Sequence, residues 1–220
     1  MKDPIISDPP QRKHLRFLCN DAQERRLLKN GYLRIAGIDE VGRGALCGPV
    51  VAAAVILNLE AVPKGIDDSK KLTPQKREEL FEAIQGSAWA VGFGLVTSNG
   101  IDQADILKAT IQAMTQAVRQ LDPVPDYLLI DALKLPQLPL PQRGLVHGDA
   151  QSVSIAAASI LAKVTRDGMM REFDRIYPQY GLGHNMGYGT PEHLESLRRF
   201  GPSPIHRRTF KPVSQLRLSF

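Results

Sequence analysis

Four carboxylate residues occur in the same kind of sequence context. Each one ends or closely follows a segment predicted to be a β-strand. They are Asp39, Glu40, Asp131 and Asp149. Charged side chains avoid such buried surroundings unless they are paired, hydrogen-bonded or bound to a metal ion. In α/β sheets, the side chains that do chemistry gather at strand ends. If these strand ends are neighbours, the four carboxylates repel one another, and Mg²⁺ or Mn²⁺ is the usual partner of such an all-oxygen set.

The alternative is that these residues shape turns. A lone aspartate at a strand end is more often a turn former or helix cap than a ligand. Three such sites in one chain are less readily explained as coincidence. Neighbouring residues on a strand also point to opposite faces, so Asp39 and Glu40 serve one site only if the chain leaves the strand there. The glycines at Gly42 and Gly44 permit that departure.

Two loops carry residues suited to binding a nucleic acid. In the first, Gly42 and Gly44 let the backbone approach a ligand closely, and Arg43 offers a guanidinium group for phosphate. A tight turn with a solvated arginine is the alternative. In the second, Tyr188 lies between glycines, where an aromatic ring is well placed to stack on a sugar or a base.

Positive charge is concentrated in the last part of the chain. The formal net charge is +5, and residues 197–220 hold six basic residues and no acidic one. This distribution suggests a polyanionic partner on one side of the molecule. Lys70 and Lys71 could also neutralise phosphates, or they belong to a solvated loop. His193 is expected on a helix surface and His206 in a loop, so no histidine base is predicted.

The elements that must position these residues alternate between strands and helices. Strands are predicted at residues 33–38, 50–57, 88–96, 127–130 and 145–147, and helices at 20–29, from 74 onward, and at 106–121, 154–177 and 191–200. This order argues for an α/β layer fold with a mixed sheet. The longest apolar run is too short for a membrane span, and the first residues lack a signal peptide. With only two cysteines as well, a cytoplasmic protein is expected.

Six ordered segments resemble the motifs of bacterial ribonuclease HII. They are GIDEVGRGALCGPVVAAAVIL at 37–57, DDSKKLTPQKREEL at 67–80, YLLIDALKLP at 127–136, HGDAQSVSIAAASILAKVTRD at 147–167, YGLGHNMGYGTPEHLESL at 180–197 and HRRTF at 206–210. The resemblance implies an α/β, ribonuclease H-like fold: a five-stranded mixed sheet flanked by helices, with a C-terminal helical portion. It places the family's site residues on Asp39, Glu40, Asp131 and Asp149, on Gly42, Arg43 and Gly44, and on Tyr188. His147 and Met186 stand where the family usually has lysine.

The resemblance also implies a reaction. It is that of a type HII ribonuclease H, which hydrolyses the RNA strand of RNA/DNA hybrids and cuts 5′ of single ribonucleotides embedded in duplex DNA. The hypothesis for its mechanism is two-metal-ion catalysis with Mg²⁺ or Mn²⁺, leaving 3′-hydroxyl and 5′-phosphate ends. Two alternatives remain at this point: a fold-related nuclease acting on all-DNA junctions, and a non-catalytic nucleic-acid-binding module.

The chain is predicted to divide into three parts. These are a loosely attached N-terminal arm at 1–30, the catalytic domain with its C-terminal helices at 31–212, and a tail at 213–220. In the tail, Gln215 and the alternating Leu216, Leu218 and Phe220 resemble the peptide by which bacterial replication proteins dock on the DNA sliding clamp. Alternatively, these apolar side chains fold back on the domain. A monomer without a membrane partner is expected.

Overall fold

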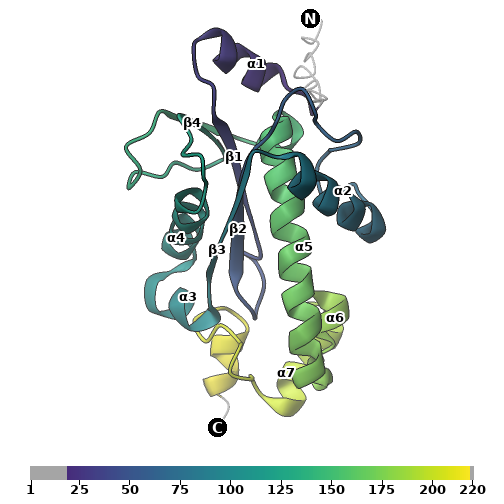
Figure 1. Ribbon diagram of the computed structural model, residues 1–220. Coiled ribbons are helices and arrows are strands. Elements are labelled where there is room, and N and C mark those ends of the chain that lie inside the picture. Colours follow the sequence, from purple (N-terminus) through teal and green to yellow (C-terminus); the bar gives the residue numbers. More distant parts are fainter. Residues whose placement is uncertain (1–18, 219–220) are drawn as a thin grey trace, which may run out of the picture.

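The computed structural model describes residues 19–218, and five strands in this range form a single sheet (Figure 1). The strands are β1 Ile35–Val41, β2 Val50–Ile56, β3 Ala90–Val96, β4 Tyr127–Asp131 and β5 Gln142–Leu145. Their order across the sheet is β3-β2-β1-β4-β5. The pairs β1–β2 and β2–β3 are antiparallel, whereas β1–β4 and β4–β5 are parallel. The predicted five-stranded mixed sheet is therefore confirmed.

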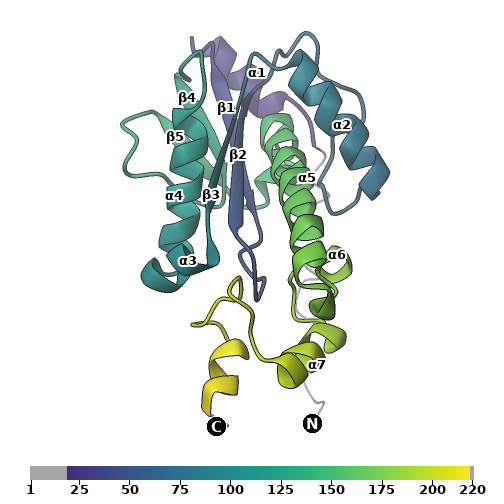
Figure 2. The same ribbon diagram turned by 60° about the horizontal axis from the view of Figure 1, so that its bottom comes forward.

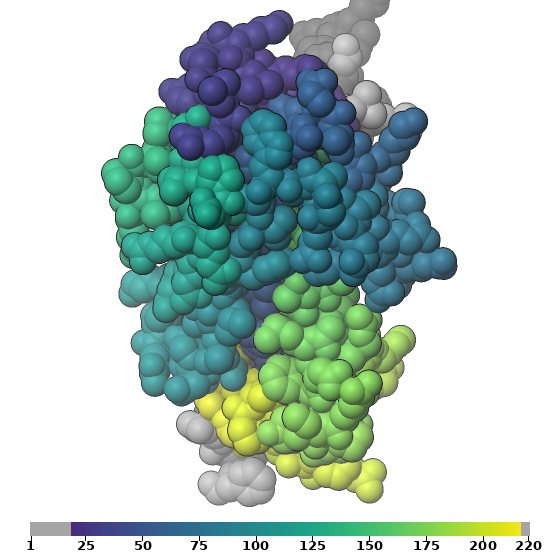
Figure 3. Space-filling model, viewed as in Figure 1, coloured from purple at the N-terminus to yellow at the C-terminus, as the bar shows by residue number. Residues whose placement is uncertain are grey.

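Helices cover both faces of this sheet. They are α1 Ala22–Lys29, α2 Pro74–Ser87, α3 Ser98–Ala104, α4 Ile106–Arg119, α5 Val153–Ile176, α6 Leu182–Asn185 and α7 Pro191–Phe200. Helix α4 packs on one face and α5 on the other, with α2 beside α5 (Figure 2). The segments α6, α7 and 201–218 lie together at the end of the molecule opposite α1, as the yellow-green and purple surfaces of Figure 3 show.

Strand β2 shows why both faces are covered, since all seven of its residues are buried. Alternate side chains point to opposite faces. Ala52 and Ala54 belong to the apolar cluster that includes α4, and Ala53 and Val55 belong to the cluster that includes α5. The sheet is thus the middle layer of three. Among the helices described in residues 19–218, none is long and apolar enough to be a membrane span.

Two helices begin where the sequence predicts. The Thr73 hydroxyl accepts a hydrogen bond from the Lys76 amide at the start of α2, and the Thr190 hydroxyl accepts one from the His193 amide at the start of α7. A proline follows each threonine, at a position where the missing amide hydrogen costs nothing. Helix α3 was not predicted.

Every strand differs by one to three residues from at least one of its predicted boundaries, and two of these differences lie close to the carboxylates. β1 does not stop at residue 38 but runs to Val41, so Asp39 and Glu40 lie within the strand and pair with residues of β2. β5 covers 142–145 instead of the predicted 145–147, and His147 beyond its end adopts a left-handed conformation with φ of 56°. As a result, Asp39 lies within β1 instead of after it, and Asp149 lies four residues beyond the end of β5.

Helix α1 packs against the sheet and the start of α5, unlike the loose arm expected from its sequence. Its Glu24 is fully buried, and the Oε1 atom accepts hydrogen bonds from the Ser152 hydroxyl at 2.5 Å and the Ser154 amide at 3.0 Å, at the start of α5. Leu27 and Leu28 pack against the sheet beside them. The boundary at residue 30 stays a prediction, and residues 1–18 lie outside the described range.

Candidate active site

Three of the four predicted carboxylates line one cleft of about 420 Å³. The residues that form its walls are Asp39, Glu40, Val41, Gly42, Arg43, Gly44, Ser69, Lys70, Asp131, Ser159, Lys163 and Tyr188. Side chains from β1, β4, α5 and the loop after α6 therefore meet in one place. The predicted substrate residues Gly42, Arg43, Gly44, Lys70 and Tyr188 are among them.

The register of the sheet explains why Asp39 and Asp131 come together. Pairing between β1 and β4 ends at Ile38 and Ile130. The next residue on each strand is an aspartate, so the two carboxylates stand at neighbouring positions where the strands separate. Glu40 follows on β1, whose edge toward β4 has no strand partner beyond Ile38. Both side chains line the cleft although both lie within β1, so the expectation that the chain must leave the strand at this point is wrong.

Asp149 lies next to the same cluster, in the turn before α5. The Gly148 amide donates a hydrogen bond of 2.7 Å to Asp131 Oδ1, which fixes the turn before α5 against the end of β4. Asp149 is buried there, and its Oδ2 lies 3.3 Å from the ammonium nitrogen of Lys70. Its negative charge contributes to the raised pKa of Asp131, for which burial is the largest cause.

The cluster carries more negative charge than its surroundings neutralise. Asp39 is buried, and burial together with the charges of Glu40 and Asp131 raises its pKa well above the usual value. Burial also raises the pKa of Glu40, although Arg43 at 3.3 Å opposes this effect. The Oε2 atom of Glu40 is buried and has no hydrogen-bond partner among residues 19–218.

Divalent metal ions fit this donor set. It offers carboxylate oxygens, including an unpartnered buried one, and the mutual repulsion of its carboxyl groups is what a bound cation relieves. Oxygen ligands of this kind are preferred by Mg²⁺ and Mn²⁺ over zinc. The ligand set expected from the sequence comes from three backbone segments: Asp39 and Glu40 from β1, Asp131 from the end of β4, and Asp149 from the turn before α5.

The glycine loop and the tyrosine face each other across the cleft. A Cβ atom placed on Gly44 would lie 4.0 Å from the Tyr188 ring, which is the nearest group to it. Gly42 has φ of +91°, and a Cβ there would lie 2.2 Å from Arg166 Nε. The Tyr188 side chain is 38% exposed, so its ring is available to a ligand.

Two fully buried arginines hold these loops in place. Arg207 donates hydrogen bonds to the carbonyl oxygens of Gly42 at 2.7 Å and Arg43 at 2.8 Å. Arg166 donates to the carbonyl oxygens of Met186 and Pro49, both at 2.9 Å. Arg207 was counted in the basic segment expected to contact a polyanion. That interpretation is wrong for this residue, because its guanidinium group is buried against backbone carbonyls.

Sequence analysis missed several residues of the cleft wall. Ser159 and Lys163 lie four residues apart on α5, a spacing that places both on one face of a helix and that could have identified them. Lys163 forms an ion pair of 2.7 Å with Asp167. The predicted Lys71 does not line the cleft, since its ammonium group pairs with Asp67 at 3.1 Å.

Comparison with known proteins identifies the family to which this chain belongs. The family model described as Ribonuclease HII matches residues 36–213. The chain belongs to the ribonuclease HII family. A curated ribonuclease HII from Geobacillus kaustophilus is 58% identical over 193 residues, which cover 88% of this chain and 74% of that protein. As a member of this family, the chain is a metal-dependent ribonuclease H of type HII.

Solved structures of ribonuclease HII relatives share the fold. The ribonuclease H2 of Pyrococcus horikoshii superposes with a TM-score of 0.72 at 27% identity, covering 84% of this chain and 97% of that one. The ribonuclease HII of Archaeoglobus fulgidus, whose structure is a complex with PCNA, has a TM-score of 0.69 at 26% identity and covers 83% of this chain and 96% of that one.

Proposed function

We propose that this ribonuclease HII hydrolyses the RNA strand of RNA/DNA hybrids and cuts on the 5′ side of single ribonucleotides embedded in duplex DNA. The products are 3′-hydroxyl and 5′-phosphate ends. One observation carries the proposal: the carboxylate cluster shares its cleft with the Gly42–Gly44 loop and the exposed ring of Tyr188. Residues that hold metal ions thus stand beside residues able to recognise a sugar.

Recognition of the ribonucleotide rests on its 2′-hydroxyl, a donor and acceptor that DNA lacks. The backbone at Gly44 can approach this hydroxyl because no Cβ intervenes. Arg207 fixes the direction of the peptide groups by binding the carbonyl oxygens of Gly42 and Arg43. Tyr188 stacks on the neighbouring deoxyribose, so the loop and the ring together read a junction from RNA to DNA.

The carboxylates have a separate role. Asp39, Glu40, Asp131 and Asp149 would hold two Mg²⁺ or Mn²⁺ ions, which when bound supply an acidified water and charge neutralisation at the phosphate. The Gly148 amide keeps Asp131 oriented toward the cleft. Lys70 and Lys163 line the same cleft and contribute positive charge toward the flanking phosphates. The predicted role of Lys71 would require it to leave Asp67.

The decisive assay uses a DNA duplex with one ribonucleotide, incubated with Mg²⁺ or with a chelator. We expect a single cut on the 5′ side of the ribonucleotide, only with metal, and none in Asp131→Asn, which removes a ligand at nearly constant volume. An all-DNA duplex and an all-DNA junction are the matched controls. Cleavage of the junction at a comparable rate would favour the junction nuclease, and cleavage of either control would exclude the proposed specificity.

Tyr188→Ala is expected to lower kcat at an isolated ribonucleotide by roughly tenfold to a hundredfold, because the scissile phosphate loses its alignment. Affinity for the duplex should change much less, since phosphate contacts supply most of it. Single-turnover kinetics and a binding titration on the same duplex measure the two effects. Tyr188→Phe serves as the control for ring stacking. An equal loss of binding and turnover would mean that Tyr188 is structural.

We also propose that residues 215–220 bind a DNA sliding clamp. The described part of this segment lies in the short helix Val213–Leu218, where Gln215 is exposed and Leu216 is half-buried against the C-terminal apolar cluster. Binding would therefore release Leu216 from the domain. The Archaeoglobus relative is known in complex with PCNA, which supports a clamp partner for this chain. Residues 219–220 lie outside the described range.

A peptide of residues 213–220 is expected to bind a bacterial clamp in the micromolar range, equivalent to about −8 kcal/mol. Deletion of residues 215–220, or Gln215→Ala, should remove clamp binding by the whole protein and spare hydrolysis in solution. Lys211→Ala, an exposed change just before the segment, is the control. Calorimetry with purified clamp measures each affinity. Undiminished binding by the deletion variant would refute this proposal.

A further inference from the structure

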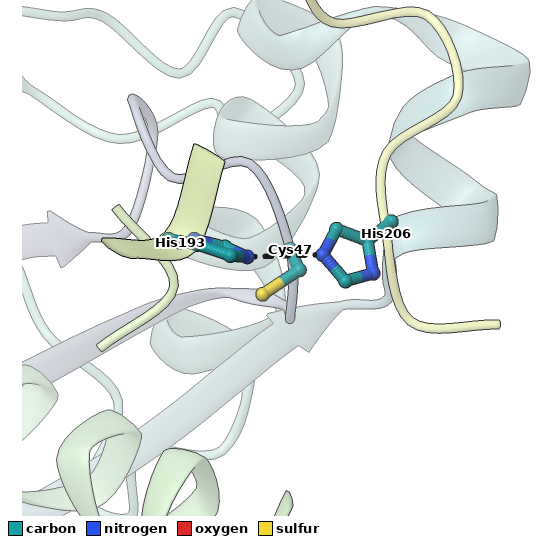
Figure 4. Close-up of side chains that lie close together, drawn as sticks. All are labelled: Cys47, His193 and His206. Carbon is teal, nitrogen blue, oxygen red and sulfur yellow. Dashed lines mark hydrogen bonds between the residues drawn. The ribbon is translucent and has the colours of Figure 1, made fainter. Parts of the chain in front are cut away.

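A buried cluster of Cys47, His193 and His206 lies outside the carboxylate cleft (Figure 4). The sulfur and one ring nitrogen of each histidine all lie within 4.8 Å of one another. Cys47 belongs to the segment after the glycine loop, His193 to α7, and His206 to the segment that pairs with Cys47 in an isolated β-bridge. The expectation of a surface position for His193 is wrong, since the residue is fully buried.

The hydrogen bonds around the two rings allow a single arrangement of protons. The Ser203 amide donates to His206 Nδ1 at 3.0 Å, so that nitrogen carries no proton. In the neutral ring the proton is then on Nε2, which donates to His193 Nε2 at 3.0 Å. His193 Nδ1 lies 2.9 Å from the Tyr188 carbonyl oxygen and must donate to it. A directed chain thus runs from Ser203 to Tyr188.

This arrangement disfavours a metal ion at the cluster. A metal would need the lone pair of His206 Nε2, which would move the proton to Nδ1 and set it against the Ser203 amide. Burial raises the pKa of the Cys47 thiol to about 12, although the neighbouring charges of Arg166 and Arg207 oppose this, so the thiol stays protonated. Those two guanidinium groups also repel a cation.

The ring pair is held neutral by its surroundings. Burial lowers the pKa of His193, and burial with the charges of His193 and Arg208 lowers that of His206 to about 4. The Tyr180 ring packs on His206 with centroids 4.8 Å apart. At neutral pH each ring therefore has one donor and one acceptor nitrogen, as the chain of hydrogen bonds requires.

We propose that His193 and His206 are positioning residues for Tyr188. Their hydrogen bonds connect Tyr188 to the segment 206–207, whose Arg207 also binds the glycine loop. Tyr188 lies in the loop between α6 and α7, where the preceding residues Met186 and Gly187 have φ of 51° and 81°. His193 binds the carbonyl oxygen of Tyr188 itself. Arg207, next to His206, binds the carbonyl oxygens of the glycine loop. Residues 206 and 207 therefore contribute to the distance between the two recognition elements, together with the Leu46 amide, which donates to the Gly187 carbonyl oxygen at 2.7 Å.

Two variants of His193 separate positioning from mere packing. Asn at position 193 can place an amide nitrogen where Nδ1 is and keep the bond to Tyr188, whereas Gln reaches toward His206 and loses it. We expect kcat at an isolated ribonucleotide to fall roughly tenfold in His193→Gln and to stay near the wild-type value in His193→Asn. His184→Ala, an exposed change on α6, is the control. Equal losses in both variants would refute the proposal.

A double-mutant cycle tests whether the effect passes through Tyr188. In a Tyr188→Ala background, His193→Gln should lower kcat less than twofold, because the ring that it positions is already absent. The same tenfold loss in both backgrounds would show that His193 acts elsewhere. Thermal unfolding of each variant identifies any that fail to fold, and the cycle is read only on those that retain the wild-type transition.

A spectroscopic test does not depend on the substrate, although the inference itself rests on the proposed role of Tyr188. Long-range ¹H–¹⁵N spectra at neutral pH should show the proton on Nε2 of His206 and on Nδ1 of His193, unchanged when Zn²⁺ is added. The opposite tautomer, or a shift on adding zinc, would refute the hydrogen-bond chain. If the spectra agree but the wild-type protein does not cut at a ribonucleotide, the failure lies with the proposed function.

Discussion

Asp39→Asn is expected to abolish cleavage and to stabilise the metal-free protein against unfolding. Asp39 is buried beside Glu40 and Asp131, which raise its pKa, so ionisation of this group costs free energy in the folded state. Removing the charge relieves that cost by about 1–2 kcal/mol, a common gain when an active-site residue is neutralised. The same change removes a proposed metal ligand, so stability and activity are expected to change in opposite directions.

The measurement is urea unfolding in chelator and in Mg²⁺. In chelator the variant should have the higher free energy of unfolding, and added Mg²⁺ should stabilise the wild-type protein more than the variant. Because the pKa of Asp39 is higher in the folded state, the folded protein binds more protons, and the stability of the metal-free wild type should decrease as pH rises above the ordinary aspartate range. Glu195→Gln, a change at an exposed ion pair, is the control. A variant less stable than wild type in chelator would contradict the prediction.

Gly37→Ala is expected to destabilise the fold by about 3 kcal/mol or more, because α5 lies directly on the backbone of β1. A Cβ at this position would be 2.1 Å from the carbonyl carbon of Ser154 and 2.3 Å from its oxygen. Both atoms belong to the helix backbone and cannot move aside as a flexible side chain could. The first turn of α5 would have to separate from the sheet, and Asp149, just before that turn, would shift with it.

Gly168→Ala provides the matched control within α5. A Cβ at Gly168 meets no atom within 4 Å, so alanine should stabilise the helix by up to about 1 kcal/mol. Urea unfolding compares the two variants with the wild type, and cleavage of the single-ribonucleotide duplex reports on the site. Unfolding of Gly37→Ala at the wild-type urea concentration would show that α5 can move away at little cost.

The sequence predicts elements well where a local pattern determines them. The spacing of apolar residues identifies α4 and α5, and a threonine followed by proline marks the start of α2 and of α7. Strand boundaries are predicted less well, and one of these errors lies at the site: β1 continues through Asp39 because its pairing with β2 extends to Val41. That pairing depends on residues distant in sequence, which a local pattern does not contain.

The carboxylates can be predicted because several of them recur at the ends of strands, whereas the residues that hold the two loops cannot. Arg207 looks like a surface base in a basic segment, and His193 like a polar residue on an exposed helix. Their burial is compensated by carbonyl oxygens from other parts of the chain, such as that of Gly42, 165 residues before Arg207. Only the folded structure brings such partners together.

The separation between Gly42 and Arg207 also orders events during protein synthesis. At about 5–20 residues per second, the ribosome makes Arg207 roughly 8–33 seconds after Gly42. By then the strands and α5 have been translated and can assemble. Until Arg207 is made, the carbonyl oxygens of Gly42 and Arg43 lack the hydrogen bonds that its guanidinium group donates. The carboxylates can therefore come together in the nascent chain before the glycine loop is fixed. If that loop selects the substrate as proposed, substrate selection is the last property of the site to form.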